Sequence, residues 1–290
     1  MSTREYSLWQ QWFKGPRKSW RPCYSDVLPD RPRDYARVGE TEPIEWTSDP
    51  RTLDLMNDEV RLPRDPVPWR TWDTMQGRPV QMGHPTKTMK VRASHKDHGV
   101  QEFVVPAPND GPLWVEDFPR PLWSQIIQGT DRHAIVVGRK TTCEMIGVST
   151  TSGTIQCASA GVWDNSTGAL LDGRPVIACR RQLAPMLLGR DDVMNVIPHR
   201  LTITVRGSDK DPRHFPWLND WIALDLKRVP TDLPREARVL ADMLCTHGAI
   251  VGDHGGITNL SVIAGANWNG IDWGGWAPKL SDFRRVTSPA

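Results

Sequence analysis

Proline spacing is the feature that most constrains the first part of this chain. Six prolines fall within the first 60 residues, and their spacing allows neither a long helix nor a central β-strand. A segment without such elements builds no core of its own, so it is either disordered or ordered by another molecule. The six residues are Pro16, Pro22, Pro29, Pro32, Pro43 and Pro50.

Tryptophan favours order by another molecule. The chain has 14 tryptophans against three tyrosines and five phenylalanines, and six of the tryptophans precede residue 73. An indole ring buries a large apolar area and keeps one N–H donor, which suits interfaces and sugar-stacking surfaces alike. We therefore expect residues 1–60 to form a long, extended assembly arm that binds a neighbouring subunit. The expected contact residues are Trp9, Trp12, Arg17, Trp20, Arg21 and Trp46.

The rest of the chain favours β-structure. Short runs of alternating or β-branched residues are separated by turn signals, and the first two runs predict a hairpin. Strands are expected at residues 87–93, 101–105, 133–138, 143–148, 154–157, 161–163, 176–179, 201–206, 221–226, 249–251 and 259–264.

One helix is expected at residues 232–247. Asp232 supplies an N-cap, Pro234 lies in the first turn, and His247 with Gly248 forms a typical C-terminal stop. The pattern as a whole predicts a mainly β fold, with a β-sandwich or jelly-roll-like domain and one covering helix. We expect this domain to span residues 61–275, between the arm and a C-terminal tail of residues 276–290.

Charge and hydropathy exclude several classes of protein. The chain has 36 basic and 34 acidic residues, and a net charge of +2 is too small to indicate a nucleic-acid partner. No apolar run approaches the roughly 18 residues that a membrane-spanning helix needs. The first 15 residues lack the apolar segment of a secretory signal.

Cysteine usage argues against a metal or redox motif. The five cysteines include no Cys-x-x-Cys pair, which excludes a zinc ribbon, and we expect neither a metal nor a cofactor. Free, buried thiols are the favoured interpretation, and a disulfide between Cys143 and Cys157 is the alternative.

Carboxylates and histidines lie next to several predicted strands. If these strand ends meet at one edge of a sheet, paired carboxylates can act as acid and base in glycoside cleavage, and a His/Asp group can bind a metal. The structural alternative is that the aspartates cap turns and the histidines are satisfied edge residues, and it is the favoured one. The candidates are Asp131, His133, Asp164, His199 and Asp253.

A second tryptophan group lies near the C-terminus. Residues 267–276 interleave Trp268, Trp273 and Trp276 with glycine and asparagine. Such rings can stack on sugars or fill a neighbour's groove, and we favour the interface.

Five phrases in order carry a resemblance to a known family. They lie at residues 131–137, 160–171, 183–193, 198–205 and 247–256. Together they resemble a family of bacterial secreted β-rich domains of largely unassigned function, over residues 119–272. Where that family has a Ser-Ala-Asp-Ala-Ala-Gly stretch, this chain has Cys-Arg-Arg-Gln at 179–182. If the stretch serves catalysis in the family, that activity is lost here.

The short Trp- and Pro-rich N-terminal segment lacks a signal peptide and contains the phrase Ser-Trp-Arg-Pro-Cys-Tyr-Ser-Asp-Val at 19–27. In these features it resembles minor tail proteins of actinobacterial tailed phages. This resemblance implies a structural, non-enzymatic component of a phage tail or tail tip, made in the host cytoplasm and located in the virion. Its partners would be other virion tail proteins. The alternative is a domain that binds or cleaves host cell-wall glycan.

Overall fold

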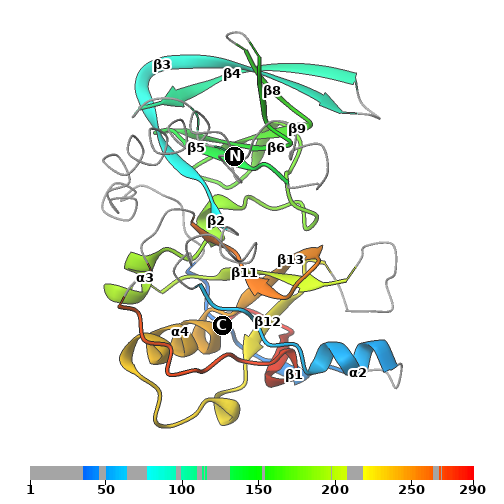
Figure 1. The fold of residues 1–290 in the computed structure, drawn as a ribbon, viewed down its shortest axis with the longest axis vertical. Helices are drawn as coiled ribbons and strands as arrows, with labels where there is room; N and C mark the ends of the chain where they lie inside the picture. Colours follow the sequence, from blue (N-terminus) through cyan, green and yellow to red (C-terminus); the bar gives the residue numbers. More distant parts are fainter. Residues whose placement is uncertain are drawn as a thin grey trace, which may run out of the picture.

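The chain folds into two β-sheets stacked one above the other, as the computed structural model in Figure 1 shows. The helices among the described residues are few and short, so the predicted mainly β, sandwich-like class is confirmed. The structure describes residues 35–45, 50–63, 77–95, 99–109, 113, 115, 131–151, 154–196, 198–207, 218–263, 268 and 270–290.

The first sheet has eight strands and lies at the top of Figure 1. Its order is β10-β9-β6-β5-β3-β8-β7, and β4 pairs with β3 in the long antiparallel hairpin that the sequence predicted. The strands are β3 (Val80–His95), β4 (Gly99–Pro108), β5 (Ala134–Val137), β6 (Thr141–Ile146), β7 (Ser149–Thr151), β8 (Thr154–Cys157), β9 (Ser159–Asp164) and β10 (Leu170–Gly173).

The second sheet has six strands in the order β1-β16-β12-β13-β11-β14. Its strands are β1 (Thr41–Pro43), β11 (Leu201–Arg206), β12 (Trp221–Leu224), β13 (Ala249–Gly255), β14 (Asn259–Leu260) and β16 (Phe283–Val286). A small parallel pair, β2 (Gly77–Arg78) with β15 (Val262–Ile263), lies next to the point where the chain enters β3. The helices are α2 (Pro50–Met56), α3 (Arg190–Met194), α4 (Arg235–Thr246) and the 3-10 turns η3 (Ala184–Met186), η4 (Leu226–Arg228) and η5 (Leu280–Asp282).

Helix α4 covers the second sheet, as predicted. It begins three residues later than expected, with Pro234 rather than Asp232 as the N-cap. Its buried residues Leu240 and Leu244 pack in one core with Ala249 and Val251 of β13. The helical spacing of its apolar residues is what places them on that buried face.

Strands β5 and β13 are buried on both faces. In β5, Ala134 and Val136 face the core of the first sheet, whereas Ile135 and Val137 face a middle layer between the sheets. Ile250 of β13 enters that middle layer from below. Continuous apolar runs, rather than alternating ones, are typical of strands covered on both sides.

The middle layer contains the largest error of the strand prediction. Residues 176–179 were expected to form a strand but form a turn, in which the Arg180 N–H donates to the Ile177 carbonyl (3.0 Å). The Cys179 N–H donates to the Gly252 carbonyl (2.9 Å). The apolar residues of this stretch fill the space between the sheets. A buried irregular segment has the same apolar composition as a buried strand, so the sequence pattern does not distinguish the two.

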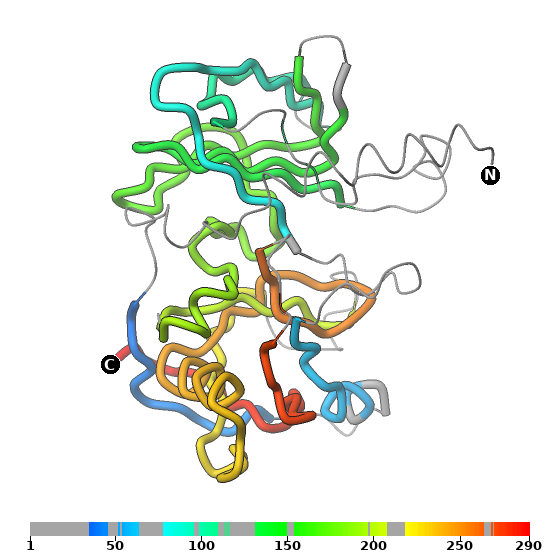
Figure 2. Tube along the Cα trace, turned by 60° about the vertical axis from the view of Figure 1, so that its left-hand side comes forward, coloured from blue at the N-terminus to red at the C-terminus, as the bar shows by residue number. Residues whose placement is uncertain are grey.

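The predicted arm is not separate from the domain over residues 35–45 and 50–60. Strand β1 pairs with β16, and Ile44, Leu55 and Val60 are buried in the core beneath α4. Figure 2 shows these first described residues beside the C-terminal strand. Isolated apolar residues among prolines cannot form a core by themselves. In this segment they are buried because β1 joins the edge of the second sheet, whose core provides the apolar contacts. Residues 1–34 and 46–49, with Trp9, Trp12, Arg17, Trp20, Arg21 and Trp46, lie outside the described residues.

The predicted C-terminal tail of residues 276–290 also belongs to the sheet. Strand β16 lies between β1 and β12, with Leu224 paired to Phe283. Leu280 and Phe283 are both buried, which explains why the segment is held in place.

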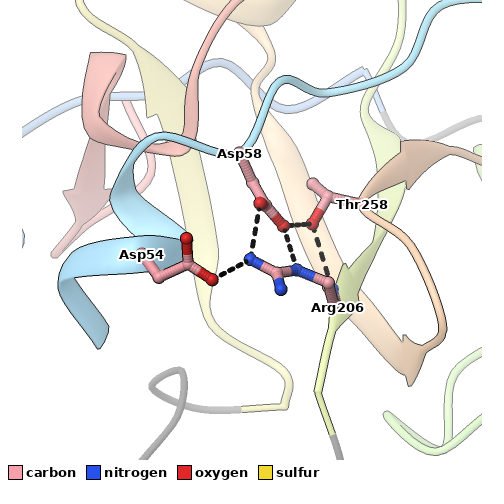
Figure 3. A network of polar contacts seen from close by, with 4 residues as sticks. All are labelled: Asp54, Asp58, Arg206 and Thr258. Carbon is pink, nitrogen blue, oxygen red and sulfur yellow. Dashed lines mark hydrogen bonds and ion pairs between the residues drawn. The ribbon is translucent and has the colours of Figure 1, made fainter. Parts of the chain in front are cut away.

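A polar network fixes α2 to the second sheet (Figure 3). The guanidinium of Arg206 donates from Nε and Nη2 to the two carboxylate oxygens of Asp58, both at 2.8 Å, and from Nη2 to Asp54 (2.7 Å). The Thr258 hydroxyl donates to Asp58 (2.9 Å) and accepts the Arg206 N–H (3.0 Å). These ion pairs raise the pKa of Arg206 above its ordinary value. A two-pronged arginine–carboxylate pair is among the stronger polar contacts.

We expect Asp58→Asn to destabilise the protein more than Asp54→Asn. The Asp58 side chain is 20% exposed and has three donors, whereas Asp54 is 67% exposed and is bonded at one oxygen. Partial exposure limits the loss for Asp58→Asn to about 1–2 kcal/mol, and the loss for Asp54→Asn to below about 0.5 kcal/mol. Urea unfolding of the two variants measures the difference. Equal losses would show that the network does not anchor α2.

Candidate functional site

Three of the five predicted site residues lie together between the sheets. Asp131 and His133 immediately precede β5, and Asp253 lies in β13 of the other sheet. Burial, hydrogen bonds and charges couple these groups, and Arg78 of β2 joins them. We call Arg78, Asp131, His133 and Asp253 the inter-sheet cluster.

A bulge in β13 directs Asp253 toward this cluster. Ile203 pairs with Val251 but Thr204 pairs with Asp253, so Gly252 is the extra residue. Without the bulge, Asp253 would share the face of Val251, which is buried under α4. A side chain at position 252 would clash with the Thr202 hydroxyl, so this position requires glycine.

Burial raises the pKa of the Asp253 carboxyl above its ordinary value. The nearby Asp131 carboxylate raises this pKa further, whereas the His254 N–H, which donates to Asp253 at 2.9 Å, and the charges of Arg78 and His133 lower it. Asp131 differs from Asp253 because its side chain is 55% exposed and lies 3.9 Å from the Arg78 guanidinium. The cluster therefore places a partly buried carboxyl, whose pKa is raised, beside one that is open to solvent.

The sequence did not single out Glu144, a buried carboxylate on β6. Glu144 is fully buried, and its Oε1 accepts the Ala184 N–H at 2.7 Å. It pairs in register with Ile135 of β5, so it faces the middle layer. Its charge contributes to the raised pKa of the Cys179 thiol, about 11, although burial is the main cause. The available signal was a lone acidic residue next to Cys143, Met145 and Ile146 in a predicted strand.

Asp164 does not join the cluster and caps a turn. Its Oδ1 accepts the backbone N–H groups of Ser166 (2.8 Å) and Thr167 (2.9 Å) and both of their hydroxyls. These hydrogen bonds, the Ser166 hydroxyl first, lower the pKa of Asp164 to about 2. This is the turn-capping alternative that the sequence left open.

His199 also lies apart from the cluster, in a buried pair with Asp192. The ring contacts the Asp192 carboxylate through Nε2 (3.0 Å) and the Arg200 carbonyl through Nδ1 (2.8 Å). Because both partners are acceptors, the ring satisfies both when each nitrogen carries a proton. Asp192 also accepts the Gly189 N–H (2.7 Å), so the pair fixes the loop around α3.

The C-terminal tryptophans pack against their own chain. Trp268 is buried in the core of the second sheet, so it does not face outward as the interface prediction requires. Trp273 lies 6.2 Å from Trp268 between ring centroids and donates from Nε1 to the Pro63 carbonyl (2.8 Å). Trp276 is partly buried against the same core. The Trp273 indole therefore ties the backbone at Pro63 to the C-terminal part of the chain.

The described cysteines are free thiols, so the alternative of a disulfide between Cys143 and Cys157 is wrong for this structure. Both belong to the core of the first sheet, and burial raises the pKa of Cys157 to about 12. In the described part of the chain, no three histidine, cysteine or acidic residues are arranged to hold a metal ion. No helix in that part is long and apolar enough to cross a membrane.

Comparison with models of protein families, with curated proteins and with solved structures found no match for this chain. The two resemblances drawn from the sequence therefore stay predictions.

We expect Asp131→Asn to lower the pKa of Asp253, because it removes the neighbouring negative charge, and Arg78→Gln to raise it. Carbon-13 NMR titration of the Asp253 carboxyl measures both shifts. Asp164→Asn is the control, because Asp164 caps a separate turn and we expect no change. Shifts of the same sign in the first two variants would contradict the arrangement of the cluster.

Proposed function

We propose that this chain is a structural component of a phage tail or tail tip that docks on neighbouring subunits through its N-terminal residues and displays the β-rich domain. The observation that carries the proposal is the anchoring of residues 35–45 and 50–63. These residues are held by pairing with β16, by Arg206 and by Trp273, so whatever the preceding residues bind is firmly connected to the domain.

The anchoring also redefines the docking segment. The proposed contact residues that remain ahead of the anchored part are Trp9, Trp12 and Trp20, with Arg17 and Arg21 as stacking or ion-pairing partners. Three indoles at roughly 150–250 Å² each supply a large part of a typical interface of about 800 Å² per partner. In this proposal the neighbour, rather than the chain's own domain, covers these rings.

Deletion of residues 1–34 tests the proposal. We expect the shortened chain to unfold at the same temperature as the full chain, since no described core residue is removed, but to be absent from assembled tails. Immunoelectron microscopy and mass spectrometry of purified particles measure incorporation. Deletion of residues 1–58 is the control, because it also removes Ile44 and Leu55 and is expected to unfold the domain. Normal incorporation of the chain lacking residues 1–34 would overturn the proposal.

The inter-sheet cluster favours a second candidate, the binding or cleavage of cell-wall glycan. In this mechanism Asp253, whose pKa is raised, donates a proton to the glycosidic oxygen. The exposed carboxylate of Asp131 then activates water or attacks the sugar. Arg78 holds Asp131 near the reacting carbon. His199 and Asp164, which lie elsewhere, have no role in this reaction.

Release of reducing sugar from bacterial cell walls tests the second candidate. Asp253→Asn and Asp131→Asn are each expected to lower the rate by about 100-fold or more, because each removes one proton-transfer group. Asp164→Asn is the matched control and is expected to keep full activity. The absence of release by the unaltered chain would exclude cleavage, and the absence of glycan binding as well would leave only the structural role.

A further inference from the structure

A groove of about 670 Å³ opens at the side of the molecule, between the two sheets. The first sheet contributes His95, Ser159 and Gly173 to its wall. Residues 174–180, which we call the middle-layer segment, contribute Arg174, Pro175, Ile177, Ala178 and Arg180, and Leu218 completes the described lining. Its volume falls within the range of sites for small ligands, roughly 300–1,000 Å³.

Two arginines line this groove, one at each end of the middle-layer segment. Arg174 follows the last residue of β10, and Arg180 ends the turn that replaces the expected strand. Among the residues that the structure describes, neither guanidinium forms an ion pair or a side-chain hydrogen bond. By contrast, Arg206 and Arg285 are each paired with aspartates. The described lining of the groove contains no carboxylate, so the two guanidinium groups together offer ten N–H donors to a ligand.

The backbone at Arg180 is strained. Its φ of 59° is in the left-handed region, which glycine adopts freely and arginine rarely adopts. Arg180 lies in the Cys-Arg-Arg-Gln stretch at 179–182. Such strain often accompanies a functional side chain, and among the described non-glycine residues Arg180 shares a positive φ with Arg132, Val196 and Asn219.

We infer that the groove binds an anionic ligand, whose phosphate or carboxylate group is held between Arg174 and Arg180. Guanidinium groups suit both anions because their parallel N–H donors match two oxygens at once. Ser159 adds a hydroxyl, and the apolar wall of Pro175, Ile177 and Leu218 accommodates the uncharged part of the ligand. A sugar phosphate or a uronic acid has this combination of groups. The inference uses none of the docking residues and none of the inter-sheet cluster, so it is independent of both proposed functions.

Isothermal titration of the full chain with four probes tests the inference. Inorganic phosphate, glycerol 3-phosphate and glucuronate are the anionic probes, and glucose is the neutral one. We expect at least one anionic probe to bind, with an affinity that falls as salt is added, and glucose not to bind. Preference for the phosphates or for glucuronate identifies which anion the groove takes. Failure of all three anionic probes, or equal binding of glucose, overturns the inference.

Substitution of the two arginines tests the location of the site. Arg174→Gln and Arg180→Gln are each expected to weaken binding at least tenfold. Arg139→Gln is the matched control, because Arg139 lies near Thr141, at the opposite end of the β6–β9 pair from Ser159, roughly 16 Å away.

Arg180→Gly provides a second check that does not depend on a loss of folding. We expect it to melt at a temperature no lower than the unaltered chain, since glycine suits the left-handed backbone, and still to lose binding. Unchanged binding in both glutamine variants overturns the inference.

Discussion

Strands β5 and β13 each bury apolar side chains on both faces, and the arrangement of the layers depends on this constraint. One face of β5 belongs to the core of the first sheet and one face of β13 to the core beneath α4. The opposite faces, with Ile135 and Ile250, must be covered by something else. Residues 176–187 provide that cover, and their irregular backbone is what leaves room for a groove and a polar cluster between the sheets.

The polar groups between the sheets follow from the same packing. The Asp253 carboxyl reaches this space only because Gly252 shifts the register of β13 by one residue. Glu144 reaches it because it pairs with Ile135, whose side chain faces the middle layer. Charges placed in such a layer are costly unless they are paired or hydrogen-bonded, so their presence is better explained by function or by loop fixation than by stability.

The sequence predicted local elements better than their partners. The β3–β4 hairpin and α4 depend on alternation and on helical spacing within short windows, and both were found. Residues 176–179 were misassigned because burial produces an apolar run whatever the backbone does. Asp131 and His133 could be expected to lie near Asp253 only if two strand ends far apart in the sequence came together. The bulge that turns Asp253 toward them is marked in the sequence by one glycine alone, Gly252. The burial of Trp268 and Ile44 depends on contacts between segments far apart in the chain, which periodicity does not report.

The two ends of the described chain leave the molecule side by side. The Ala290 N–H donates to the Arg37 carbonyl at 2.9 Å, and the Val38 N–H donates to Thr246 at the end of α4. A fluorescent reporter fused after Ala290 would therefore lie close to Arg37, near the start of the described chain. There it would obstruct a partner that binds the preceding tryptophan-bearing residues. A label inserted in the hairpin turn between β5 and β6, within the other sheet, avoids this obstruction.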